Sequence, residues 1–163
     1  MSQGPFANAG STVLFNWWQG LKHDTGGRAR LRRCHTLTEV TLEPCYQSLY
    51  HHLMLLPEVK EFRERLRERL PAIAALAAMI VSIPEHGQPI AKQMAQRIGD
   101  RKRVSEPRFQ RLLQCHEPEE IFQSLRRILP LLDQQVDLLG LANGIYYWND
   151  RLRKEWAYAY FES

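Results

Sequence analysis

Arginines are the residues of this sequence whose types and spacing could do chemistry. The segment Arg28–Arg33 holds four arginines in six residues, contains no acidic residue and directly follows Gly26-Gly27. A guanidinium fork binds phosphate oxygens in a bidentate fashion, whereas a lysine ammonium acts as a point charge. Because arginine predominates over lysine throughout the chain, this segment predicts a surface that binds phosphate groups.

Nine basic residues between positions 101 and 154 form a second set, placed where a solvent-exposed face can carry them. At about 100° per residue, Arg108 and Arg111 project from one outer side of an expected helix, away from its apolar stripe. On the next expected helix, Arg127 points opposite the apolar stripe and Arg126 lies at its edge. The candidate nucleic-acid-binding residues of both sets are Arg28, Arg30, Arg32, Arg33, Arg101, Arg103, Arg108, Arg111, Arg126, Arg127 and Arg151.

A simpler interpretation of each arginine is a solvated helix face that balances nearby acidic residues. Glu117, Glu119 and Glu120 precede the arginines of one helix and could serve in that way. The segment Arg28–Arg33 has no such acidic neighbours in the sequence. It is therefore the stronger candidate for binding.

No motif indicates catalysis. The sequence lacks a GxxxxGK[ST] phosphate loop and the GxGxxG, HExxH and GxSxG patterns. His51 and His52 diverge by about 100° on a helix, so they cannot readily share a metal ion. The Cys-His pairs at positions 34–35 and 115–116 are interpreted as packing. We expect no catalytic residue, no metal site and no cofactor.

Tryptophans could provide stacking platforms for bases. The four in this sequence are Trp17, Trp18, Trp148 and Trp156. They recur at helical spacing together with aliphatic residues, which favours a place in the core. We therefore do not count them among the candidate binding residues.

Length and composition limit the class of protein. A chain of 163 residues, 44% of them apolar, can bury a core without metals or disulfides, and its net charge of +4 is only mildly basic. Its three cysteines form no CxxC pair, which favours a reducing cytoplasm. Residues 1–10 show no signal peptide, and the longest apolar run, Ala72–Val81, is shorter than the roughly 20 residues of a membrane span. We expect a cytoplasmic protein without membrane contact.

Apolar residues recur with a helical period along most of the chain, which predicts an all-α fold of about eight or nine helices. We expect a single compact domain, 1–163, with candidate lobes 1–85 and 86–163 on either side of the break at Pro84–Pro89. The expected helices are Ser11–Lys22, closed by Gly26-Gly27; Pro44–Met54; one from Pro57, restarted or kinked at Pro71; Ile90–Ile98; one capped by Ser105; one from Pro118; and, from Leu138, either one long helix or two broken near Asn149-Asp150.

Two stretches, Val104–Leu113 and Leu125–Leu129, carry a resemblance to a known family. With them the chain resembles the CasB family, the small subunit of the type I-E CRISPR surveillance complex called Cascade. The order of other features agrees with this family. Trp17-Trp18 precedes Gly27–Arg33, and a tryptophan-bearing helix ends with Trp156–Phe161.

The resemblance implies a non-catalytic helical protein, present as two copies beside the other Cascade subunits. Such a protein would contact the CRISPR guide RNA and both strands of the target DNA. Sequence recognition is left to base pairing, while backbone charge stabilises the heteroduplex and the displaced strand of the R-loop. The basic surface of the family matches Arg32, Arg33, Arg101, Arg108, Arg111, Arg126 and Arg127 of this sequence.

A helical adaptor that contacts only proteins is the alternative function. In that case the arginines would meet acidic surfaces of partner proteins, which fits a merely mild net charge. Salt-sensitive binding to nucleic acid would distinguish the two functions.

Overall fold

The computed structural model describes residues 4–163, and helices make up nearly all of their regular structure. Eleven α-helices, one 3₁₀ helix and one small hairpin within this range confirm the all-α class. The chain divides after Ala78 into two units. The expected break at Pro84–Pro89 lies inside the second unit. Residues 1–3, which belong to the N-terminal segment predicted to contain no signal peptide, lie outside the described residues.

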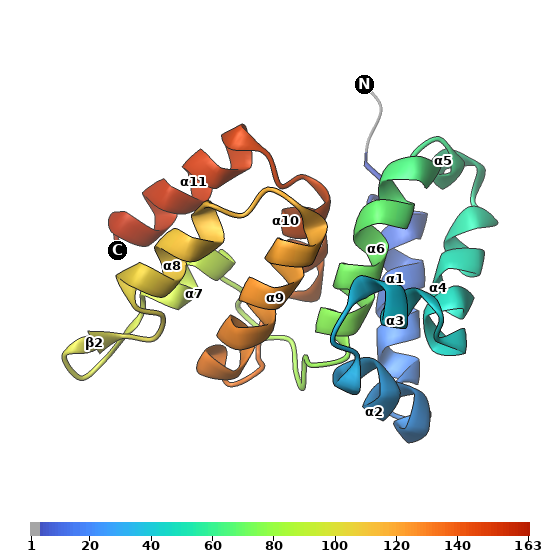
Figure 1. Ribbon diagram of the computed structural model, residues 1–163, viewed down its shortest axis with the longest axis horizontal. Helices are drawn as coiled ribbons and strands as arrows, with labels where there is room; N and C mark the ends of the chain where they lie inside the picture. The colour runs from blue at the N-terminus through green and yellow to red at the C-terminus, as the bar shows by residue number, and fades with distance from the viewer. Residues whose placement is uncertain (1–3) are drawn as a thin grey trace. The chain divides into compact units, whose positions relative to one another are not determined.

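The first unit is built around α6, whose C-terminal half is completely buried. Helices α2, α3 and α4 pack against α6, and α1 packs against α4 (Figure 1). The helices of this unit are α1 (Ala9–Gly20), α2 (Thr25–Arg33), α3 (Leu37–Thr41), α4 (Pro44–Met54), α5 (Pro57–Lys60) and α6 (Arg63–Ala77).

The glycine pair Gly26-Gly27 lies in the first turn of α2, so the prediction that it ends the preceding helix was wrong. Asp24 is the N-cap residue of α2, and its carboxylate accepts a hydrogen bond of 3.0 Å from the Gly27 amide. A Cβ atom at position 27 would lie 2.3 Å from Asp24 Oδ2. Because Gly27 has no side chain, it leaves room for the capping carboxylate. The N-cap of α1 is likewise Asn8 rather than the predicted Ser11.

The chain after Pro57 forms two helices rather than one. Helix α5 ends at Lys60, and α6 begins at Arg63 and continues through the buried Pro71. Because α6 ends at Ala77, the apolar run 72–81 is helical only in its first part, and Val81 is 51% exposed. Short helices such as α3 and α5 raise the count above the expected eight or nine.

The second unit contains the remaining elements. They are α7 (Ile90–Ala95), β1 (Arg97–Ile98), β2 (Arg101–Lys102), α8 (Glu106–Leu113), α9 (Pro118–Ile128), the 3₁₀ helix η1 (Leu129–Leu132), α10 (Leu138–Tyr146) and α11 (Asp150–Phe161). In Figure 1, α8 lies between the hairpin and α11, and α9 runs beside α8. No helix within residues 4–163 is both long and apolar enough to cross a membrane.

A β-hairpin replaces the last turn of the helix predicted over Ile90–Ile98. Strands β1 and β2 pair antiparallel through a two-residue turn in which Gly99 has φ +63°. Glycine adopts such a backbone angle without strain, so it favours a tight hairpin turn here. Strands of two residues show no measurable alternation, which is why periodicity missed them.

The segment from Leu138 forms two helices, α10 and α11. Of the two predicted alternatives, one long helix or two, the second is therefore the one observed. Asn149 ends the connection and caps α11 by accepting a hydrogen bond of 2.9 Å from the Leu152 amide. Tyr160 of α11 is completely buried, and its hydroxyl donates a hydrogen bond of 2.6 Å to the Val104 carbonyl. This contact fixes α11 to the segment that leads into α8.

Candidate nucleic-acid interface

Three of the candidate arginines line one cleft on the second unit. Arg108 and Arg111 come from α8, and Arg127 comes from α9. All three are exposed. Within residues 4–163 the structure shows no ion pair for any of them. The cleft has a volume of about 170 Å³, and its other lining residues are Cys115, Glu120, Gln123, Ser124 and Ile128.

The size and chemistry of this cleft suit a phosphate group. Sites for drug-sized ligands usually measure roughly 300–1,000 Å³, and this cleft is smaller. Guanidinium groups bind phosphate oxygens, and the hydroxyl of Ser124 adds a neutral donor at the wall. The cleft can therefore hold one phosphate of a nucleic-acid backbone with some water.

Buried aromatic contacts hold α8 in place beneath the arginines. Phe109, between Arg108 and Arg111 in sequence, is completely buried and stacks on Tyr160 with ring centroids 4.0 Å apart. At the other end of α8, Arg153 Nε donates a hydrogen bond to the Leu113 carbonyl. These contacts fix the direction in which α8 presents its two arginines.

The one carboxylate that lines the cleft is engaged at a helix end. Glu120 completes a capping box at the start of α9, where its Oε1 accepts hydrogen bonds from the amides of Glu117 (3.1 Å) and His116 (3.3 Å). These hydrogen bonds, first that from Glu117, lower the pKa of Glu120 below its ordinary value. The carboxylate is thus held by backbone donors, and the cleft keeps an excess of positive charge.

The four arginines of α2 lie in different environments, although the sequence places them in one segment. Arg28 Nε donates a hydrogen bond of 3.0 Å to the Ala78 carbonyl, just beyond the end of α6. Burial, and then the charge of Arg32, lower the pKa of Arg28. Arg30 forms an ion pair of 3.1 Å with Glu43, an acid that the fold brings in from outside the segment. Arg32 and Arg33 are exposed at the end of the helix.

The other candidate arginines occupy separate places on the second unit. Arg103 bridges to Asp133 at 3.1 Å and is half-buried, and Arg151 forms an exposed pair with Glu155 at 3.5 Å. Arg101 is exposed on β2. Arg126 is half-buried, with its guanidinium 5.9 Å from the Phe122 ring centroid, which confirms its predicted place at the edge of the apolar stripe.

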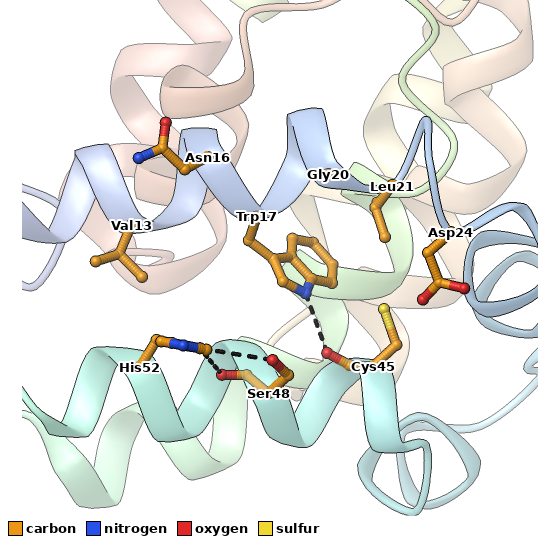
Figure 2. A pocket seen from close by; sticks show the side chains of 9 residues that line it. All are labelled: Val13, Asn16, Trp17, Gly20, Leu21, Asp24, Cys45, Ser48 and His52. Carbon is orange, nitrogen blue, oxygen red and sulfur yellow. Dashed lines mark hydrogen bonds between the residues drawn. The ribbon is translucent and has the colours of Figure 1, made fainter.

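A different cavity, of about 420 Å³, lies between α1 and α4 in the first unit (Figure 2). The Trp17 indole N–H donates a hydrogen bond of 3.0 Å to the Cys45 carbonyl. His52 Nδ1 lies 2.7 Å from the Ser48 carbonyl oxygen, which can only accept, so Nδ1 carries the proton. The polar groups of the walls are thus paired largely with one another.

Cys45 in this cavity is expected to resist alkylation at neutral pH. Burial, followed by the charge of Asp24, raises the pKa of Cys45 to about 11. Because the thiolate is the nucleophile, we expect the rate of iodoacetamide labelling to rise about tenfold per pH unit up to pH 10. Mass spectrometry of the labelled peptide would measure it, with Cys45→Ala as the blank. A rate that already levels off near pH 8 would contradict this expectation.

The tryptophans and histidines form no additional site in the part of the chain that is described. Trp18 and Trp148 are buried, as predicted, whereas Trp17 and Trp156 are only half-buried. Across residues 4–163, no three His, Cys, Asp or Glu side chains are arranged to hold a metal ion. Sequence reasoning did miss two exposed aromatic residues, Tyr158 and Phe161 of α11. The helical wheel that assigned the buried stripe of this helix could also have revealed them on its outer face.

Together, the fold and the cleft define a small all-α protein in which arginines from two helices line one cleft. Comparison of the sequence with protein families identifies it further, because the family described as CRISPR-associated protein Cse2 matches residues 27–161. The chain belongs to this family, the CasB small subunits of Cascade in type I-E CRISPR systems. Members of the family are non-catalytic structural subunits of that complex.

The family match covers nearly the whole chain, including α8, α9 and α11. Helix α1, which forms one wall of the cavity in Figure 2, lies before the matched range. No curated protein and no solved structure matches the sequence.

Proposed function

We propose that this chain is a non-catalytic Cascade subunit that binds the nucleic-acid backbone and stabilises the R-loop. Its ligands would be the heteroduplex of guide RNA and target DNA and the displaced DNA strand. Its other partners would be the remaining Cascade subunits and a second copy of itself, in the cytoplasm. Family membership supports the assembly, and the convergence of Arg108, Arg111 and Arg127 on one cleft carries the nucleic-acid part.

Backbone binding of this kind can change the outcome of R-loop formation. Strand exchange replaces a DNA duplex by a heteroduplex of similar stability, so a few phosphate contacts are enough to shift the balance. Contacts to phosphate carry no direct sequence information. An arginine cleft therefore complements recognition that base pairing already provides.

Salt dependence tests this function on the purified full chain. Fluorescence anisotropy would measure its affinity for a labelled single-stranded oligonucleotide between 50 and 200 mM salt, concentrations over which backbone binding changes strongly. The one phosphate held by the cleft contributes about −0.7 to the slope of the logarithm of affinity against the logarithm of salt concentration, and each further phosphate contacted by other exposed arginines adds the same amount. Absence of salt-sensitive binding would contradict the proposal.

The protein-only adaptor remains the second candidate, favoured by the ion pairs that Arg30 and Arg103 already make with carboxylates. For an adaptor, capture of the other Cascade subunits would survive nuclease treatment, and the anisotropy of the oligonucleotide would not change.

A further inference from the structure

A stripe of cationic and aromatic side chains runs along the outer face of α11. Arg151, Lys154, Tyr158 and Phe161 are spaced by three, four and three residues, so they fall within an arc of about 80° on the helix. The stripe is about 15 Å long at 1.5 Å per residue. Its N-terminal half is cationic and its C-terminal half is aromatic.

The two aromatic rings of this stripe are unusually accessible. Tyr158 is 68% exposed and Phe161 is 45% exposed, while Tyr160 on the opposite side of the helix is completely buried. The core therefore accounts for Tyr160. Phe161 meets Phe109 and Tyr160 edge-on, with ring centroids 5.9 Å and 5.0 Å away, while the rest of its ring and most of Tyr158 remain exposed. Large exposed side chains of this kind indicate a binding surface when they lie together.

The hairpin adds positive charge beside the aromatic end. Lys102 Nζ donates a hydrogen bond of 3.3 Å to the Tyr160 carbonyl and lies 5.8 Å from the Phe161 ring centroid. Arg97 is paired with Lys102 across the strands, so the two side chains share one face of the hairpin. At the other end of the stripe, Arg151 pairs with Glu155 at 3.5 Å, but both are exposed, and such pairs contribute little.

We propose that this stripe, which we call the α11 stripe, binds single-stranded nucleic acid by stacking bases on Tyr158 and Phe161. Arg151, Lys154 and Lys102 would contact the phosphates on either side of the stacked bases. This inference rests on the proposed function and adds to it a second binding surface, at which bases are stacked. Proteins that bind single strands combine a positive track with aromatic platforms in this way.

The combination of side chains favours a single strand over the other occupants. In a duplex the base faces are stacked within the helix and cannot reach a protein ring, whereas an opened strand exposes them. A protein partner that covered the two rings would also have to desolvate or pair the lysines and the arginine that flank them. A single strand satisfies both halves of the stripe at once.

An oligonucleotide without bases separates stacking from phosphate binding. Anisotropy with the full chain would compare an oligothymidine with an abasic oligonucleotide of the same length, for wild type and for the double variant Tyr158→Ala/Phe161→Ala. We expect the double variant to lose at least about 5-fold in affinity for oligothymidine, because stacking contributes roughly 1–3 kcal/mol per base. Its affinity for the abasic oligonucleotide should stay unchanged.

Two matched variants control for folding and for general loss of aromatic surface. Tyr158→Phe keeps the ring and should retain the affinity of wild type. Phe15→Ala removes a ring that is 40% exposed on α1, a helix that does not belong to the stripe, and should also bind as wild type does.

Each remaining outcome overturns the inference. Equal, salt-sensitive affinity of wild type for the two oligonucleotides would leave the proposed function intact and exclude stacking. Binding of neither oligonucleotide would overturn both proposals. Loss of another Cascade subunit from the double variant, with unchanged affinity for oligothymidine, would assign the α11 stripe to a protein interface instead.

Discussion

Reversal of charge in the cleft, by Arg108→Glu, Arg111→Glu and Arg127→Glu together, is expected to weaken binding of single-stranded nucleic acid about 100-fold. Hydrogen bonds to charged groups contribute roughly 1.5–3 kcal/mol each, and part of this remains with the arginines outside the cleft. The salt dependence should also become shallower, by about 0.7 in the log–log slope, because the contact with the cleft phosphate is removed. Anisotropy titrations at several salt concentrations would measure both quantities.

A control triple variant with the same change in net charge distinguishes the cleft from general electrostatics. Lys60, Arg63 and Lys92 are exposed and lie outside the cleft, on α5, α6 and α7. Their replacement by glutamate should lower affinity much less than reversal in the cleft does. Equal losses from the two triple variants would show that overall charge, and not the cleft, governs binding.

Substitution of Phe109 by alanine is expected to lower the free energy of unfolding by about 3–5 kcal/mol. The Phe109 ring is completely buried, stacks on Tyr160 and meets Phe161 edge-on with centroids 5.9 Å apart. Its removal leaves a cavity beneath α8 and frees the helix that carries Arg108 and Arg111. Urea denaturation followed by circular dichroism would measure the change, and nucleic-acid affinity should fall with it.

Tyr158→Ala provides the stability control for this substitution. Because its ring is 68% exposed, its removal should change the free energy of unfolding by less than about 0.5 kcal/mol. A loss below 1 kcal/mol for Phe109→Ala would contradict the role of this ring in positioning α8.

The sequence was sufficient for the helices that carry strong local signals. The prediction of Pro44–Met54 matches α4, and Pro118 begins α9 as expected. Ser105 and Pro107 mark the start of α8. In each case a proline in the first turn sets the helix start by local chemistry alone.

Elements decided by contacts between distant residues could not be predicted in this way. The role of Gly27 depends on where the Asp24 carboxylate lies in space, and a hairpin as short as β1–β2 leaves no periodic signal. The partners of Arg28 and Arg30 could not be predicted either, because Ala78 and Glu43 lie 50 and 13 residues away from them along the chain. Helical wheels gave the exposed side of each helix but could not show that Arg108, Arg111 and Arg127 share a cleft.

The most direct test of R-loop stabilisation is the lifetime of the R-loop in assembled Cascade that carries this subunit. The complex with wild-type subunit would be compared with the complex that carries the triple charge reversal at Arg108, Arg111 and Arg127, after equal incorporation of the subunit is confirmed. The cleft mechanism predicts faster collapse of the R-loop in the variant complex, and a larger difference at higher salt. An unchanged lifetime, with the variant subunit fully incorporated, would contradict it.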